Sequence, residues 1–293
     1  MTLTAMADER PIGLAPLGFL DLAPAQFIRT AARAGFRSVG LRAQAAVAGG
    51  AQYPLVAGSA DLDAIREAIA ETGVAVDVIE VISLHRQVHI ADLESMLRCA
   101  SVIGASRVLC TGDDVDLGAV ASKFAELCDL AHSVGMSAHL EFMRFRTGVQ
   151  TLADAMQIVR QANRLNGFVA VDILHLIRSG GSVQSLGHLP LDRVGIVQLC
   201  DGPLLAPPDT GLAEEARHNR LPPGEGEFPI AELLAMLPAH IGLDVEVPLS
   251  GARAGWSHDE RASLLYTATR DFLRRHASSG ATSGPGRVKP PKG

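Results

Sequence analysis

Four polar side chains stand at or near the ends of short apolar runs in the second half of the sequence. They are Glu141, Asp172, Gln198 and Glu246, in the runs 137–143, 168–176, 193–202 and 241–248. Three carboxylates and one amide are hard oxygen donors, which suit Mg²⁺ or Mn²⁺ better than Zn²⁺. If the runs are parallel strands of one closed barrel, their ends meet, and the sequence predicts one divalent metal ion held by these four ligands.

A second interpretation pairs each carboxylate with an arginine. Ionised carboxylates inside strands cost several kcal/mol each unless a positive partner accompanies them. The arginines available for such pairs are Arg42, Arg144, Arg146, Arg220 and Arg253. Four oxygen-bearing side chains on four consecutive strands favour the metal, because neighbouring strand ends in a small barrel reach a single ion.

The elements that must position these residues alternate along the whole chain. Strand candidates at 12–19, 36–42, 74–84 and 106–113 precede the four runs above, and helix candidates lie at 23–35, 62–73, 91–103, 115–134, 151–165, 229–238 and 258–275. Asp61 is expected to cap the second of these helices. Glycines 35, 73, 104 and 135 end successive helices at intervals of 38, 31 and 31 residues, and Asn166-Gly167 continues the series. This spacing is the size of one βα unit.

Eight strands alternating with helices indicate an α/β protein with parallel strands. The count of eight predicts a (β/α)₈ TIM barrel formed by a single domain, residues 1–276, followed by a disordered Gly/Ser/Pro-rich tail, residues 277–293. An open doubly wound sheet is the alternative. Neither the G-x-G-x-x-G nor the G-x-x-x-x-G-K-[ST] nucleotide-binding motif occurs where such a sheet would carry it.

Composition narrows the class of protein further. The net charge of −6 argues against non-specific binding of nucleic acid, because such binding needs a basic protein surface. No apolar run approaches about 18 residues, so no membrane span is expected, and the four single cysteines indicate reduced core residues. We therefore expect a cytoplasmic protein that acts on a small molecule. The sequence leaves a homodimer open.

Several side chains near the strand ends could contact a substrate. His175 follows Asp172 by three residues, and a loop of about 25 residues follows the seventh strand, long enough to cover a substrate. The residues expected to bind substrate are His175, Arg220, Arg42 and His218. Phe145 and Trp256 are expected to form an aromatic wall beside it.

These motifs resemble those of the sugar phosphate isomerase/epimerase superfamily, the xylose isomerase-like TIM barrels. The matching segments are L-E-F-M at 140–143, D-x-x-H at 172–175, V-Q-L-C-D-G at 197–202, P-G-E-G at 223–226 and D-V-E-V-P at 244–248. The resemblance implies that Glu141, Asp172 and Glu246 bind a divalent metal ion and that His175 and Arg220 contact substrate. Its fourth ligand is usually histidine, where this chain has Gln198.

The resemblance implies an isomerase or epimerase of sugar-like or sugar-phosphate-like substrates. A metal-bound enediolate forms as one carboxylate takes a proton, and Glu141 and Glu246 are the expected catalytic pair. The epimerases carry a second glutamate where this chain has Thr147. The leading alternative is a metal-dependent lyase of the 3-dehydroshikimate dehydratase type. Further alternatives are the apurinic endonuclease branch of the superfamily and a barrel that binds a ligand without turnover.

Overall fold

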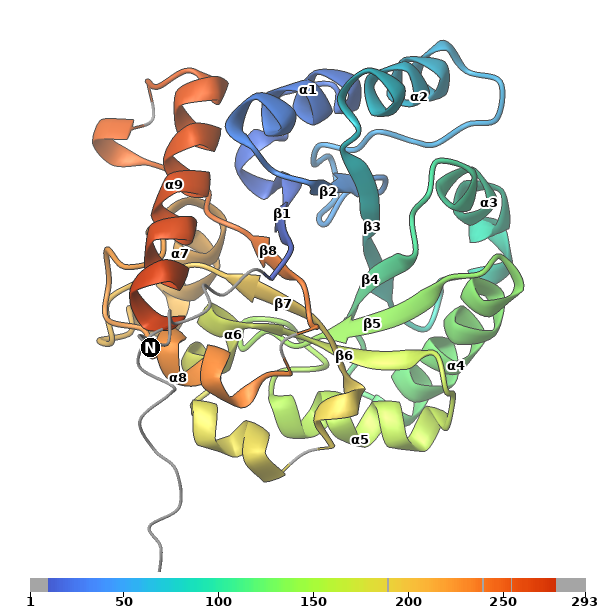
Figure 1. Cartoon of the computed structure of the whole chain (residues 1–293). Coiled ribbons are helices and arrows are strands. Elements are labelled where there is room, and N and C mark those ends of the chain that lie inside the picture. The colour runs from blue at the N-terminus through green and yellow to red at the C-terminus, as the bar shows by residue number, and fades with distance from the viewer. Residues whose placement is uncertain (1–9, 189, 239, 254, 278–293) are drawn as a thin grey trace, which may run out of the picture.

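The computed structural model describes residues 10–277 except 189, 239 and 254. Eight parallel strands close into a barrel in sequence order, with β1 paired to both β2 and β8 (Figure 1). The strands are β1 (Ile12–Leu14), β2 (Ser38–Arg42), β3 (Ala75–Leu84), β4 (Arg107–Gly112), β5 (Ser137–Glu141), β6 (Gly167–Asp172), β7 (Val194–Leu199) and β8 (Leu243–Val245). The predicted TIM barrel is confirmed.

Helices surround this barrel (Figure 1). They are α1 (Pro24–Ala34), α2 (Ala60–Thr72), α3 (Glu94–Val102), α4 (Leu117–Ser133), α5 (Leu152–Ala162), α6 (Ile173–Arg178), α7 (Leu212–His218), α8 (Ile230–Met236) and α9 (His258–Ala277). Because α9 reaches Ala277, all but the first residue of the expected tail lies outside the described residues. Within the described part of the chain, no helix is both long and apolar enough to cross a membrane.

Most helices end where the sequence predicts. The glycines at 35, 73, 104 and 135 have φ values of 104°, 69°, 96° and 78°, the left-handed conformation that glycine adopts without strain. The prediction for α5 is wrong, because Asn163, with φ 51°, ends it and Gly167 begins β6. Ser59, and not Asp61, caps α2 by accepting a hydrogen bond from the Leu62 amide.

β1 is shorter than the predicted strand 12–19. Pro16 begins a short 3₁₀ helix, Pro16–Phe19, and proline cannot donate a hydrogen bond to a neighbouring strand. Three residues nevertheless close the barrel, since Ile12, Gly13 and Leu14 pair with Leu243, Asp244 and Val245 of β8. The Ala15 amide also donates to the Val245 carbonyl at 3.0 Å.

The barrel interior is layered. Val78, Leu109, Ala170 and Ile196, from β3, β4, β6 and β7, form a small apolar cluster inside the barrel. Two residues further along the same four strands come Glu80, Thr111, Asp172 and Gln198, all buried. Because side chains alternate between the faces of a strand, these four point inward one level nearer the carboxyl ends. The apolar layer is therefore the floor beneath the polar residues of the site.

Candidate metal centre and active site

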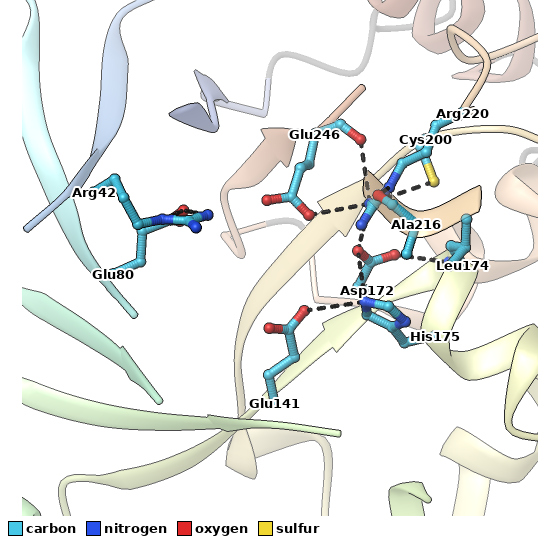
Figure 2. Close-up of polar contacts among 10 residues, drawn as sticks. All are labelled: Arg42, Glu80, Glu141, Asp172, Leu174, His175, Cys200, Ala216, Arg220 and Glu246. Carbon is cyan, nitrogen blue, oxygen red and sulfur yellow. Dashed lines mark hydrogen bonds and ion pairs between the residues drawn. The ribbon is translucent and has the colours of Figure 1, made fainter. Parts of the chain in front are cut away.

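A buried cluster of three side chains that could hold a metal ion lies at the carboxyl ends of β5 and β6 (Figure 2). Glu141 ends β5 and Asp172 ends β6, and their carboxylates lie 3.9 Å from His175 Nε2. One ligand atom from each of the three residues lies within 4.8 Å of the other two. These distances allow a single ion to bind all three.

The D-x-x-H spacing brings Asp172 and His175 together. Asp172 is the N-cap of α6, and its carboxylate accepts a hydrogen bond from the Leu174 amide at 2.8 Å. His175 lies one helical turn on, so its side chain returns to the same side as Asp172. The immediate start of α6 after β6 is what makes His175 a member of the cluster.

Arg220 joins Asp172 to Glu246 (Figure 2). Its Nη1 lies 2.6 Å from Asp172 Oδ2 and 3.0 Å from Glu246 Oε2, and all three side chains are buried. The Ala216 carbonyl, in the last turn of α7, accepts a 2.7 Å hydrogen bond from Arg220 Nε and orients the guanidinium. The arginine interpretation therefore describes Asp172 and Glu246, whereas Glu141 has no arginine partner among the described residues.

Gln198 lies beside Asp172 in the barrel. The two residues are paired in register between β6 and β7. Gln198 is buried, and its Oε1 accepts no hydrogen bond from any described residue. This amide oxygen is therefore an acceptor that the described residues leave unused.

Glu80 is a site residue that the sequence interpretation omits. On the opposite wall of the mouth, Arg42 of β2 donates two hydrogen bonds to Glu80 Oε1 of β3, at 2.6 and 3.0 Å (Figure 2). Both side chains are buried. The sequence does show an acidic residue within the apolar run 78–84. Whether its side chain points into the barrel, however, depends on an irregularity in the pairing of β3 with β4 between Ile79 and Ile82.

The buried charges at the mouth do not balance. Among the described residues there, four carboxylates face two guanidiniums: Glu80, Glu141, Asp172 and Glu246 against Arg42 and Arg220. Fully ionised, this set has an excess of two negative charges, which one divalent cation would neutralise. Glu141 Oε1 and Gln198 Oε1 are also buried without hydrogen-bond partners in the described structure. The residues present therefore fit a divalent ion.

The pKa values reflect the same imbalance. Burial raises the pKa of Glu141 well above its usual value, and the nearby Glu246 and Asp172 raise it further. Burial raises the pKa of Glu246 to about 8, although Arg220 opposes the shift. At Asp172 burial acts in the same direction, but Arg220 and His175 outweigh it and lower the pKa. Burial lowers the pKa of His175 to about 4, so its imidazole is neutral at neutral pH and can act as a ligand.

A cavity of about 600 Å³ opens above these residues. Its lining includes the four residues expected to bind substrate, His175, Arg220, Arg42 and His218, together with Glu141, Glu246 and Phe145. Trp256 is absent from the lining and is 39% exposed. A cavity of this size suits a small organic molecule.

The fold and this site define a family. The profile of the xylose isomerase-like TIM barrel matches residues 28–268, and the chain belongs to that family. A curated relative, a 3-dehydroshikimate dehydratase of Pseudomonas aeruginosa strain PAO1, is 32% identical over 165 residues. The match spans 53% of this chain and 26% of the relative, so the chain covers about a quarter of the relative's length.

Solved structures share the fold. A xylose isomerase-like TIM barrel/4-hydroxyphenylpyruvate dioxygenase fusion protein gives a TM-score of 0.75 at 22% identity, covering 94% of this chain and 45% of that one. An L-ribulose 3-epimerase gives a TM-score of 0.69 at 16% identity, and the match covers 96% of this chain and 100% of the epimerase chain. At such identities the likeness establishes the architecture and leaves the reaction open.

Proposed function

We propose that this chain is a divalent-metal-dependent dehydratase acting on a small cyclic hydroxy-ketone acid of the 3-dehydroshikimate type. The observation that carries the proposal is the buried excess of carboxylates over guanidiniums beside a cavity of about 600 Å³. The sequence motifs favour isomerisation, but the dehydratase relative supports loss of water instead. Both reactions begin with removal of a proton from a carbon beside a carbonyl group.

Glu141, Asp172 and His175 would hold the ion, and Gln198 Oε1 is suited to complete the set. A bound divalent ion polarises a carbonyl oxygen and stabilises the negative charge that develops there. The four ligands predicted from the sequence all offer oxygen atoms, whereas this set includes the imidazole nitrogen of His175. A nitrogen ligand favours Mn²⁺ over Mg²⁺. Glu246, the remaining predicted ligand, lies outside this cluster and is paired through Oε2 with Arg220, so we assign it another role.

We assign proton transfer to Glu141 and Glu246, which both line the cavity. Arg220 holds Glu246 Oε2, which leaves Oε1 to exchange a proton. One carboxylate removes a proton from the substrate carbon, and the other delivers a proton to the departing hydroxyl, which leaves as water. For 3-dehydroshikimate, this loss of water gives an aromatic dihydroxybenzoate.

The test is to incubate the purified protein with Mn²⁺ and 3-dehydroshikimate and to follow the aromatic product by ultraviolet absorbance. We expect product formation that stops on addition of a chelator and resumes with Mn²⁺. Absence of product at every divalent ion tried would refute the dehydratase assignment.

The isomerase remains the second candidate, because the sequence motifs favour it and the first chemical step is shared. Incubation with hydroxy-ketone sugars in D₂O separates the two reactions. Deuterium uptake by the sugars without loss of water would support an isomerase. Sugars that stay free of deuterium, together with formation of aromatic product from 3-dehydroshikimate, would support the dehydratase.

A further inference from the structure

The arginines that line the cavity differ in their partners. Four of the five have a carboxylate oxygen within 4.0 Å: Arg42 with Glu80, Arg146 with Asp113, Arg220 with Asp172, and Arg261 with Asp21, at 2.6, 3.3, 2.6 and 3.9 Å. The fifth, Arg217 of α7, has no carboxylate partner within the described part of the chain. Its charge is therefore not neutralised by a carboxylate of the described residues.

Phe145 places Arg217 close to the buried cluster. The Arg217 guanidinium carbon lies 5.6 Å from the centre of the Phe145 ring, within cation–π range. The same ring meets the His175 ring edge-on, with their centres 5.7 Å apart. A small ring bound beside His175 would thus have Phe145 alongside it and Arg217 within reach of its far end.

The backbone that carries Arg217 is fixed, although the side chain is exposed. Glu215, two residues earlier on α7, accepts two 2.7 Å hydrogen bonds from Arg178 of α6, and both side chains are buried. Arg178 also donates to the Pro203 carbonyl at 2.7 Å. The helix is therefore anchored to the barrel, and Arg217 needs only a side-chain rotation to meet a ligand.

We propose that Arg217 is a specificity-determining residue that binds a carboxylate at the end of the substrate opposite the metal cluster. This inference rests on the proposed function, whose substrate class carries such a group. A guanidinium offers a carboxylate two parallel hydrogen bonds, a geometry that a neutral substituent cannot match. The cavity thereby selects anionic hydroxy-ketones over neutral sugars.

The experiment compares two probes on the full chain with Mn²⁺ by calorimetry: 3,4-dihydroxybenzoate and its uncharged amide, 3,4-dihydroxybenzamide. In Arg217→Gln we expect the Kd of the benzoate to rise about tenfold or more, as for a lost hydrogen bond between charged groups, while the Kd of the amide stays within twofold. The control is Arg144→Gln, which removes an exposed arginine that pairs with Asp209 outside the cavity lining. It should leave both constants unchanged.

Equal weakening of both probes, or unchanged binding of the benzoate, would overturn the role of Arg217. So would a wild-type protein that binds the amide as tightly as the benzoate. These outcomes do not depend on turnover. If 3-dehydroshikimate gives no aromatic product but the benzoate preference exists and disappears in Arg217→Gln, the dehydratase assignment fails and the carboxylate site stands.

Discussion

The Glu141 and Glu246 carboxylates have different neighbours and are assigned complementary roles in the proposed reaction. Glu141 lies beside His175 and has no guanidinium partner in the described structure, whereas Glu246 is held by Arg220. Replacing either carboxylate by an amide keeps its shape and removes its ability to move a proton. At Glu246 the effect of such a change should therefore fall on the rate of the chemical step, whereas at Glu141 the change also removes a charged ligand from the metal cluster.

We expect Glu141→Gln and Glu246→Gln each to lower kcat by about 10²-fold or more, the usual contribution of general acid–base catalysis. Steady-state kinetics on Mn²⁺-loaded protein would measure it. Glu126→Gln, at an exposed pair with Lys123 on α4, is the matched control and should keep full activity. Retention of more than about a tenth of kcat in both site variants would refute the assignment.

The Arg42–Glu80 pair gives a prediction about stability. Glu80→Ala leaves the Arg42 guanidinium buried without its partner, which should lower the free energy of unfolding by about 3–5 kcal/mol. Replacing both residues, Arg42→Met with Glu80→Leu, should restore most of that stability. Denaturant unfolding measures both effects.

The control for this pair is Glu71→Ala, which breaks the half-exposed Arg29–Glu71 pair and should cost less than about 1 kcal/mol. If Glu80→Ala is no less stable than Glu71→Ala, the buried pair does not contribute as proposed.

Sequence reasoning identified Glu141, Asp172, Gln198 and Glu246 as a group because each closes an apolar run, and the structure places all four, buried, at one end of the barrel. It could not show that Arg220, 48 residues beyond Asp172, would pair with both Asp172 and Glu246. Long-range ion pairs depend on how a loop folds, and residue spacing does not encode that. His175 was recognised, but as a substrate contact and not as a member of the metal-binding cluster.

At the scale of elements, the loop between β7 and α8 positions Arg220. Buried Asp201, just after β7, accepts hydrogen bonds from the amides of Gly202, Gly224 and Phe228 at 2.8, 2.9 and 2.9 Å. One carboxylate thus joins both ends of the loop. The Pro-Gly-Glu-Gly turn at 223–226 belongs to this anchor, and Gly226 is required because a Cβ there would lie 2.5 Å from Asp201 Oδ1.

We expect Asp201→Ala to free this loop, since three backbone amides lose their acceptor and Arg220 loses its fixed position. Limited proteolysis should cut within residues 203–227 faster than in the wild type, and kcat/KM should fall at least tenfold. Asp209→Ala, at a carboxylate 81% exposed in the same loop, is the control and should show neither change. If the protease cut the two variants at the same rate, Asp201 would not anchor the loop as described.

Strands and helices were predicted well where apolar runs end at glycine, because a left-handed residue stops a helix in any context. The errors have local causes. Asn163 takes the left-handed conformation three residues before the predicted Asn166-Gly167 stop, and Pro16 shortens β1. Periodicity shows neither, because it records only the spacing of apolar residues, whereas Pro16 acts through its missing N–H group and Asn163 through its backbone conformation.

At the scale of the whole molecule, the excess of negative charge at the barrel mouth links metal binding to stability. A ligand that binds only the folded chain stabilises it by about 2.7 kcal/mol at a concentration 100 times its Kd. We therefore expect Mn²⁺ to raise the Tm and a chelator to lower it, measured by thermal unfolding. Metal analysis of the untreated protein should find about one Mn²⁺ or Mg²⁺ per chain.

The control is the double variant Glu141→Gln with Asp172→Asn, which removes two charged ligands from the cluster. Its Tm should not respond to Mn²⁺. Stoichiometric Zn²⁺ that survives dialysis of the wild type would contradict the choice of ion, and an unchanged Tm in every metal would contradict the site itself.

The pairing of β1 with β8 determines when the closed barrel can first form during synthesis. The strand that completes the barrel, Leu243–Val245, is synthesised more than two hundred residues after β1, Ile12–Leu14. Until then β1 and β7 present open backbone edges, which invite pairing with other nascent chains. Chaperone dependence during synthesis should accordingly end only when this last strand emerges.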